Sequence, residues 1–366
     1  MRIGVPKEIK LDEYRVGATP ASVREYRAHG HEVIVESGAA AGLGIGDEVY
    51  RAAGATIVPT AEEAFAADMI VKVKEPQEVE WKRLRRGQTL FTYLHLAADP
   101  AQTKGLLASG CTAVAYETVT DAHGGLPLLA PMSEIAGRLA IEAAALALRK
   151  PAGGMGKLLG GVPGVLPAKV VVIGGGMVGT QAARMAVGLG AEVTVLDRSL
   201  TRLRELDDIF TGRLKTRFST REAIDEELGS ADVVVGAVLV PGAAAPKLVS
   251  RAQLAGMKPL AVLVDVAIDQ GGCFETSHPT THRDPTYTID GVIHYCVANM
   301  PGAVPLTSSH ALNNATLPFG LALADQGMEA FRDPHLRAGL NIHAGEVMHP
   351  AVAASLGLPF DPGRAS

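Results

Sequence analysis

Cysteine is scarce in this chain of 366 residues, which holds only Cys111, Cys273 and Cys296. The three form no CxxC pair and their number is odd, so a disulfide framework is not expected and a reducing cytoplasm is favoured. Apolar runs of the ~18 residues that a membrane span needs are also missing. The N-terminus becomes charged within a few residues, unlike a signal peptide. These absences predict a cytoplasmic protein with no membrane partner.

Blocks of like charge are absent as well, and the formal net charge is −5. The densest basic run, Arg83–Gly87, is typical of a solvated helix end, so no nucleic-acid partner is predicted. His278 and His282 are four residues apart, but Pro279 opposes the helix that would align them. No metal site is therefore predicted.

Aromatic residues make up only 4% of the chain, whereas apolar residues make up 47%. An aromatic-poor composition rich in Ala, Val, Leu and Gly suits parallel sheets covered by closely packed helices. The length favours two domains, each with its own core.

Short apolar runs alternate with helix-like segments in two series, which predicts βαβ units and parallel sheets. The runs of the first series are Arg2–Val5, Glu32–Glu36, Met69–Val73, Thr89–Leu94 and Thr112–Tyr116. The runs of the second series are Val170–Ile173, Glu192–Leu196, Val233–Val238 and Ala261–Val266.

Longer helices are predicted between and after these two series. One runs from Ser133, as N-cap, to Lys150 and is followed by a Gly- and Pro-rich loop, Pro151–Lys169. Two more cover Leu306–Gln326, interrupted by Pro318, and Met328–Leu340.

Gly174, Gly176 and Gly179 form a GxGxxG pattern between a buried-strand run and a helix pattern that opens with Met177 and Val178. The first glycine permits a tight turn, the second lets a pyrophosphate approach the backbone, and the third lets helix and strand pack closely. The helix N-terminus then offers N–H groups and a positive dipole end to the phosphates. The alternative is a packing turn in another α/β protein.

Asp197 ends the next predicted strand, 18 residues after Gly179, where a carboxylate can accept hydrogen bonds from the adenosine ribose hydroxyls. The same carboxylate would repel a 2′-phosphate, so NAD is favoured over NADP. Arg198, the next residue, weighs the other way.

Polar residues follow three of the apolar runs of the first series. Arg15 lies in the loop after the first run, Lys74 ends the third, and His95 ends the fourth. Ligands of open parallel sheets bind beyond the carboxyl ends of the strands, so these side chains are expected at one edge. Arginine offers a planar pair of donors to a carboxylate, lysine a point charge, and histidine a proton near neutral pH. Taken singly, each could instead be a surface cation or a core histidine.

In the second series, Asp265 falls inside a strand run and Asp269 falls just past its end. Asp269 is the better active-site candidate, although a loop cap is an equal alternative from spacing alone.

Motifs along nearly the whole chain resemble those of the alanine dehydrogenase family. They are MRIGVPKEIK (Met1–Lys10), RVGATP (Arg15–Pro20), VKVKEP (Val71–Pro76), LFTYLHLAA (Leu90–Ala98), PMSEIAGR (Pro131–Arg138), GGVPGV (Gly160–Val165), VDVAIDQGGCFET (Val264–Thr276) and NMPGAVP (Asn299–Pro305).

The resemblance implies NAD-dependent, reversible oxidative deamination of L-alanine to pyruvate and ammonium by a homohexamer. It also implies an α/β fold of two doubly wound Rossmann-like domains with parallel sheets. A cofactor domain, residues 131–303, would be inserted into a discontinuous substrate domain, residues 1–130 and 304–366.

The resemblance also assigns site residues. Arg15 and Lys74 would bind the substrate, His95 would be the general acid/base, and Asp269 would help to activate water. The NAD contacts that it implies are Ser133, Gly174, Gly176, Met177, Val178, Gly179, Asp197, Arg198, Ser219, Leu239, Asn299 and Met300. Ser219 is open to exchange with its neighbour Thr220, which offers a similar hydroxyl.

Three other functions compete with this interpretation. The NAD(H)-binding subunit of a proton-translocating transhydrogenase belongs to the same superfamily, but the joint presence of Arg15, Lys74 and His95 favours the amino-acid enzyme. A dehydrogenase of saccharopine type would act on a larger substrate. A non-catalytic NAD sensor would bind the cofactor without turnover.

Overall fold

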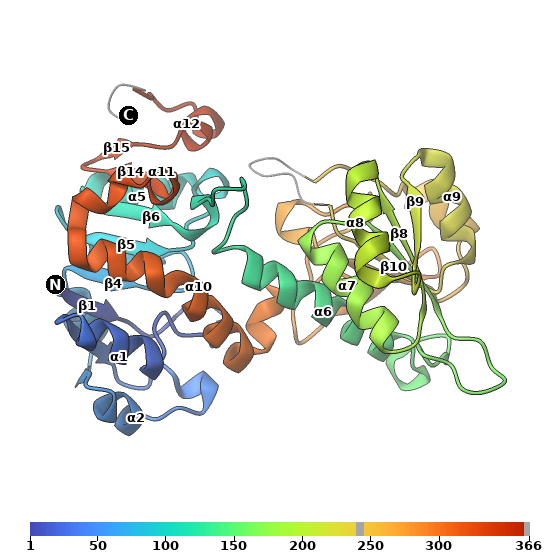
Figure 1. Ribbon diagram of the computed structural model, residues 1–366, viewed down its shortest axis with the longest axis horizontal. Helices are drawn as coiled ribbons and strands as arrows, with labels where there is room; N and C mark the ends of the chain where they lie inside the picture. Colours follow the sequence, from blue (N-terminus) through green and yellow to red (C-terminus); the bar gives the residue numbers. More distant parts are fainter. Residues whose placement is uncertain (239–244, 362–366) are drawn as a thin grey trace. The chain divides into compact units, whose positions relative to one another are not determined.

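The computed structural model describes residues 1–238 and 245–361. The chain divides into two compact units (Figure 1). The first unit comprises Met1–Met132 together with the chain from Gly302 onward, and the second unit comprises Ser133–Pro301. Within the described residues, each unit contains one β-sheet.

The sheet of the first unit has the strand order β15-β14-β6-β5-β4-β1-β2-β3 among the described residues. Its strands are β1 (Arg2–Val5), β2 (Glu32–Glu36), β3 (Thr56–Val58), β4 (Met69–Val71), β5 (Thr89–Thr92), β6 (Thr112–Ala115), β14 (Leu340–His343) and β15 (Glu346–Val347). Its helices are α1 (Pro20–Ala28), α2 (Asp47–Ala52), α3 (Ala61–Phe65), α4 (Glu78–Trp81), α5 (Pro100–Ser109), α10 (Pro305–Gln326), α11 (Pro334–Arg337) and α12 (Pro350–Leu356).

The sheet of the second unit has the order β12-β13-β11-β10-β7-β8-β9 in the described part of the chain. Its strands are β7 (Lys169–Ile173), β8 (Glu192–Asp197), β9 (Lys215–Phe218), β10 (Val233–Gly236), β11 (Val262–Asp265), β12 (Thr286–Ile289) and β13 (Val292–Tyr295). Its helices are α7 (Met177–Gly188), α8 (Leu200–Phe210) and α9 (Arg221–Ser230), and α6 (Ala130–Ala147) enters it from the first unit.

Both sheets are doubly wound in the same way. In each sheet the first strand lies at the centre, the next two strands add on one side, and the later strands add on the other side. The strand order reverses between β1 and β4 in the first unit and between β7 and β10 in the second. This topology confirms the predicted α/β class. Open α/β sheets bind ligands at such switch points, so each sheet has one edge at which ligand binding is expected.

The sheets are parallel at their centres, as predicted, and gain antiparallel strands at their edges, which the expectation of parallel sheets did not include. β14 runs antiparallel to β6, β15 antiparallel to β14, and β12 antiparallel to β13. β12 and β13 form a hairpin closed by Asp290–Gly291, and β14 and β15 form a hairpin closed by Ala344–Gly345. All four turn residues have positive φ. Two-residue turns with positive φ match the strand twist and leave no room for a crossover helix, so the strands must be antiparallel.

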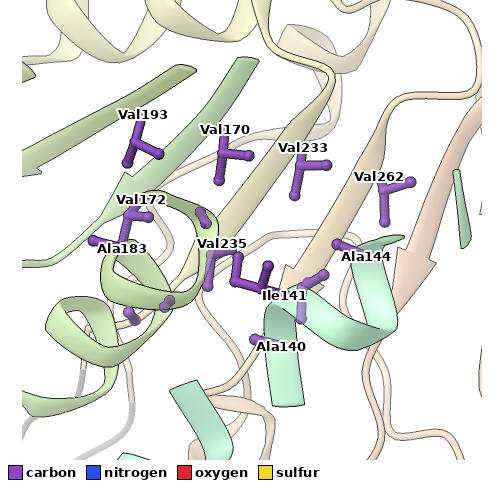
Figure 2. Packing of buried hydrophobic residues seen from close by; sticks show 14 of the residues in the cluster. Ala140, Ile141, Ala144, Val170, Val172, Ala183, Val193, Val233, Val235 and Val262 are labelled. Carbon is purple, nitrogen blue, oxygen red and sulfur yellow. The ribbon is translucent and has the colours of Figure 1, made fainter. Parts of the chain in front are cut away.

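The core of the second unit consists of small and branched aliphatic side chains. Valines of β7, β8, β10 and β11 pack against alanines of α6 and α7 (Figure 2). Val170, Val172, Val233 and Ala144 are all fully buried. The short side chains let the helices lie close to the sheet, as the composition predicts.

Three helices differ from their predicted form. The helix predicted from Ser133 begins at Ala130, so Ser133 lies within α6 and is not its N-cap. The turn that carries the Ala130 N–H to Leu126 O leads directly into the helix, and Pro131 fits its first turn, where no N–H partner is needed.

The second difference is at α10, which runs unbroken for 22 residues through Pro318. Its buried face, which includes Leu312, Thr316 and Leu323, packs on both sides of the proline and compensates for the lost hydrogen bond. Met328–Leu340, predicted as one helix, contains a 3₁₀ segment and the short α11 instead. No helix in residues 1–238 and 245–361 has the length and apolar character to cross a membrane.

Candidate active site

Arg15, Lys74 and His95 follow three strands of the first sheet that lie next to one another. Arg15 lies in the loop after β1, Lys74 shortly after β4, and His95 shortly after β5. These strands are adjacent and parallel in the order β5-β4-β1, so the loops leave the sheet at the same edge. The edge includes the switch point between β1 and β4.

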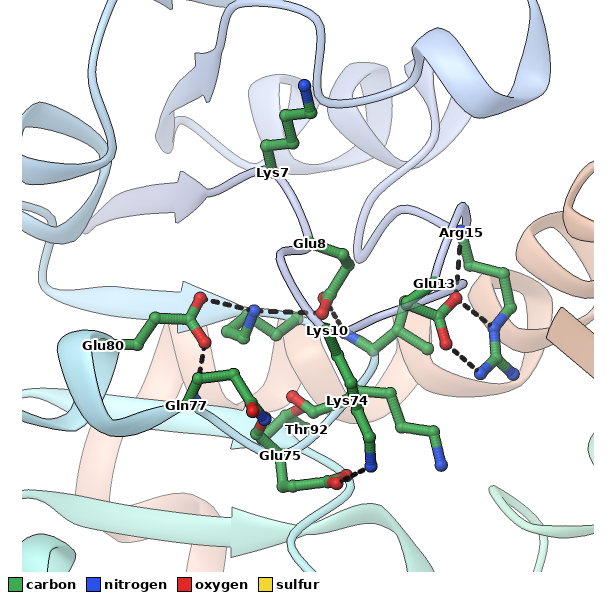
Figure 3. Close-up of polar contacts among 12 residues, drawn as sticks. Lys7, Glu8, Lys10, Glu13, Arg15, Lys74, Glu75, Gln77, Glu80 and Thr92 are labelled. Atoms are coloured by element: carbon green, nitrogen blue, oxygen red, sulfur yellow. Dashed lines mark hydrogen bonds and ion pairs between the residues drawn. The ribbon is translucent and has the colours of Figure 1, made fainter. Parts of the chain in front are cut away.

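Arg15 is buried and bound to a carboxylate that the sequence analysis did not consider. Its side chain is 2% exposed, and that of Glu13 is fully buried. Glu13 Oε1 accepts from Arg15 Nε at 2.7 Å and Oε2 accepts from Nη2 at 2.5 Å, while the Arg15 N–H also donates to Oε1 (Figure 3). The bidentate pair fixes the plane of the guanidinium group. Despite the burial, Glu13 holds the pKa of Arg15 above its ordinary value, so the group stays charged.

A second buried ionic cluster links the loops that carry Arg15 and Lys74. The Lys72 ammonium donates to Glu8 Oε2 at 3.0 Å and contacts Glu80 Oε1 at 2.8 Å, and all three side chains are at most 2% exposed. Glu8 Oε1 also accepts from the Val73 N–H at 2.7 Å (Figure 3). Glu8 therefore holds the β1 loop to the β4 loop. Burial raises the pKa of Glu8, while the two carboxylates outweigh burial and raise the pKa of Lys72.

Lys74 itself is half-buried, and Thr92 Oγ1 donates to its carbonyl oxygen at 2.9 Å. Glu75, the next residue, forms an ion pair with Lys10. Lys74 thus projects from a loop that is bonded on both sides, to β5 and to the β1 loop (Figure 3).

His95 has an unusual backbone, with φ of 49° and ψ of 39° in the left-handed region. Such a conformation is uncommon outside glycine and must be stabilised by its surroundings. Glu117, just after β6, accepts from the N–H of His95 at 2.6 Å and from that of Leu94, and its Oε1 lies 3.9 Å from His95 Nδ1. The Tyr93 ring stacks on the imidazole at 5.8 Å. Glu117 was not among the predicted site residues, although it follows β6 as the other three follow their strands.

The glycine turn of the second unit has the geometry that each glycine was expected to permit. Gly174 has a φ of 103°, and a Cβ on Gly179 would lie 1.8 Å from the Gly174 carbonyl oxygen. Gly176 is the N-cap of α7, and a Cβ there would meet no atom within 4 Å. Met177 and Val178 form the first turn of α7. The turn therefore leaves open space in front of free helix N–H groups, which fits a pyrophosphate.

Asp197 ends β8 and is bonded to this turn. Its Oδ2 accepts from the Gly175 N–H at 2.7 Å, and its Oδ1 accepts from the Ser199 N–H at 2.8 Å. Arg202, which the sequence analysis missed, donates from Nε to Gly175 O and from Nη2 to Thr180 Oγ1, both at 2.7 Å. A cation therefore lies beside the turn as well. Arg198, the residue directly after Asp197, is exposed.

Ser219 and Thr220 have different surroundings. The Thr220 hydroxyl accepts from the Ala223 N–H at 3.0 Å and caps α9. Ser219 follows β9, and its N–H donates to the Asp197 carbonyl oxygen. Ser219 is thus the better placed of the two for a cofactor contact. Leu239 lies outside the described residues.

Asp269 and Asn299 lie together in the second unit. The Asn299 N–H donates to Asp269 Oδ2 at 3.4 Å, and Asn299 is in the left-handed region with a φ of 54°. Asp269 is exposed on a 3₁₀ turn, Ile268–Gln270, whereas Asp265 is fully buried. Met300 is 4% exposed and packs into the core of this unit.

The fold and the candidate site define a class of protein, the dinucleotide-binding α/β enzymes. The second unit is a Rossmann-type sheet with a dinucleotide turn and an acidic residue after its second strand. The first unit presents cations and a histidine at the edge that includes its own switch point, an arrangement that suits a small anionic substrate.

Comparison with known proteins gives the family. Residues 4–136 match the model of the alanine dehydrogenase/PNT N-terminal domain, and residues 140–350 match that of the C-terminal domain. The alanine dehydrogenase of Halomonas elongata is 60% identical over 363 residues, which cover 98% of each chain. The chain belongs to the alanine dehydrogenase/PNT family, as the motifs predict.

Solved structures agree with this assignment. A structure of L-alanine dehydrogenase superposes with a TM-score of 0.95 at 51% identity and covers 98% of this chain and 99% of that one. The transhydrogenase of Sinorhizobium meliloti gives a TM-score of 0.82 at 26% identity, over 96% of this chain and all of that one. The transhydrogenase alternative is therefore a more distant relative.

Proposed function

We propose that this protein is an alanine dehydrogenase that interconverts L-alanine, NAD⁺ and water with pyruvate, ammonium, NADH and a proton. The observation that carries the proposal is the pairing of an open dinucleotide turn with a switch point lined by Arg15, Lys74 and His95, in a chain 60% identical to an alanine dehydrogenase. Residues 131–303 are proposed as the cofactor domain, and residues 1–130 and 304–366 as the substrate domain.

The cofactor assignment rests on the fit of the second unit. The backbone at Gly174, Gly176 and Gly179 would hold the pyrophosphate at the N-terminus of α7, with Met177 and Val178 beside it. Asp197 would accept from the adenosine ribose hydroxyls, and the remaining contacts are assigned to Ser133, Arg198, Ser219, Leu239, Asn299 and Met300. NAD supplies the hydride acceptor.

The substrate assignment rests on charge and rigidity in the first unit. Arg15, held flat by Glu13, binds the substrate carboxylate, and Lys74 provides a positive charge and a donor for the substrate oxygen. His95 exchanges the proton when water adds and ammonia leaves, with its backbone fixed by Glu117. Asp269 orients the attacking water.

Two finer features are part of the same proposal. The free thiols of Cys111, Cys273 and Cys296 support a reducing, cytoplasmic location. A homohexamer is proposed from the family alone, and a mass measurement in solution tests it.

The deciding experiment measures NADH oxidation with pyruvate and ammonium, beside the His95→Ala variant. We expect turnover by the wild type and a loss of kcat of about 10³-fold in the variant, as removal of a general acid/base predicts. An inactive wild type, or a fully active variant that binds NADH normally, would refute the proposal.

A further inference from the structure

Asp265 is a buried carboxylate that the proposed reaction does not use. It is the last residue of β11 and is fully buried. Its Oδ1 accepts from the Ala267 N–H at 3.1 Å. Its Oδ2 accepts from the N–H groups of Cys273 at 2.7 Å and Phe274 at 3.2 Å, and from Ser277 Oγ at 2.5 Å. All four donors are neutral and belong to one loop, residues 267–277.

That loop carries Asp269 on its 3₁₀ turn, Ile268–Gln270. Asp265 binds the loop on both sides of the turn, because Ala267 precedes Asp269 and Cys273 follows it. Asp265 has no exposure to solvent, so it cannot exchange a proton with a substrate, whereas Asp269 is exposed. The two carboxylates therefore have separate roles.

The loop is shaped around the Asp265 carboxylate. Gly272 has a φ of 78°, and a Cβ there would lie 2.6 Å from Asp265 Oδ2. The outer side of the loop is held by Lys247, whose ammonium donates to the carbonyl oxygens of Gly271, Gly272 and Phe274 at 2.5, 2.9 and 3.1 Å. An anion thus binds the N–H groups of the loop and a cation binds its carbonyl groups, which leaves the loop few alternative conformations.

We propose that Asp265 is a positioning residue that fixes Asp269 for the reaction. The inference rests on the proposed function, because it assumes that Asp269 acts on the substrate. Displacement of a catalytic group by about 1 Å can lower the rate about 10²-fold. Loss of the Asp265 anchor should therefore reduce kcat while the glycine turn, which follows a different strand, continues to bind NADH.

Asp232 offers a matched control in the same sheet. It directly precedes β10, at the amino ends of the strands, and its side chain is 2% exposed. It accepts from Lys157 Nζ at 2.5 Å, Lys258 Nζ at 2.8 Å and the Lys169 N–H at 2.8 Å. Its loss should weaken the fold of the second unit without moving the loop of Asp269.

The test compares Asp265→Asn with Asp232→Asn in the full-length enzyme. For Asp265→Asn we expect a fall in kcat of about 10²-fold, a change in NADH affinity of less than about 3-fold, and faster amide hydrogen exchange in residues 267–277. For Asp232→Asn we expect a lower Tm with kcat within about 2-fold of the wild type. Ser277→Ala, which removes one of four donors, should lower kcat by about 3- to 10-fold if Asp265→Asn does not fold.

Three results would overturn the inference: full kcat in a folded Asp265→Asn, an equal loss of kcat in Asp232→Asn, or unchanged exchange in residues 267–277. Failure of the proposed function is distinguishable, because the wild type would then be inactive with pyruvate and ammonium.

Discussion

The parallel strands of the two sheets follow the same order, yet the two binding edges are built by different means. In the second unit, the loop after the central strand is three glycines, and α7 begins immediately after it at Met177. In the first unit, the corresponding loop contains Glu8, Glu13 and Arg15, and α1 begins only at Pro20. One edge therefore offers backbone N–H groups, and the other offers charged side chains held by buried ion pairs.

We propose that the difference follows from the ligands that the two units bind. A pyrophosphate is large and doubly charged, and the N-terminus of a helix can bind it through the backbone alone. A small carboxylate needs a charge at a defined point, so the first unit must bury cations and hold them with carboxylates. The glycine turn of the second unit is therefore sensitive to any side chain that replaces a glycine. The charged edge of the first unit is sensitive to the loss of a charge.

The largest expected effect is on stability in the first unit, from Lys72→Met. The variant leaves Glu8 and Glu80 buried without their shared cation, which should cost about 4 kcal/mol of unfolding free energy. Burial already raises the pKa of Glu8, and protonation relieves the repulsion, so the deficit should be largest near pH 8 and shrink as the pH falls. Urea unfolding at several pH values measures this.

The control is Lys82→Met. Lys82 pairs with Glu78 on the exposed surface of α4, and its loss should leave the unfolding midpoint unchanged. Equal destabilisation by both variants would contradict the assigned role of the buried cluster.

The next effect is on the second unit, from Gly179→Ala. The added methyl group would meet the Gly174 carbonyl oxygen at 1.8 Å, which should cost about 3 kcal/mol and displace the turn. NADH affinity, measured by fluorescence titration, should fall at least about 10-fold. Gly188→Ala, at the other end of α7, meets no atom within 4 Å and should leave affinity unchanged. A Gly179→Ala variant with normal affinity would show that the turn does not bind the cofactor.

A smaller effect is expected from Asp232→Asn. Burial alone would raise the pKa of Asp232, but Lys157 and Lys258 outweigh it and hold the pKa below the ordinary value. Its stabilisation should therefore be present above about pH 4 and disappear as the pH falls through the folded-state pKa. We expect a loss of about 2 kcal/mol at pH 7, because both lysines are about one-third exposed and are partly screened. A deficit that persists at low pH would contradict the ion-pair origin.

The smallest effect is on cofactor choice. Asp197→Ser removes the carboxylate bonded to the Gly175 N–H and the charge that opposes a 2′-phosphate. The ratio of kcat/KM for NADH over NADPH should fall about 10-fold, or about 1.4 kcal/mol. An unchanged ratio would exclude Asp197 from discrimination.

Much of the architecture could be predicted because it is local. The apolar runs Arg2–Val5 and Glu32–Glu36 are the strands β1 and β2, and the glycine spacing located the turn. The misses also have local causes. The Asp290–Gly291 dipeptide is a hairpin signal that was not used, and Pro318 was given too much weight against a helix with a buried face.

The sequence by itself determined two α/β series, a dinucleotide turn and three polar residues at strand ends. Only the tertiary structure decided how those residues are held. Glu8 and Lys72 are 64 residues apart, and Glu117 reaches the backbone of His95 across 22 residues. Hydrophobic periodicity and turn residues report the chain's nearest neighbours, whereas the partners of a buried charge are set by which strand ends the sheet order brings together.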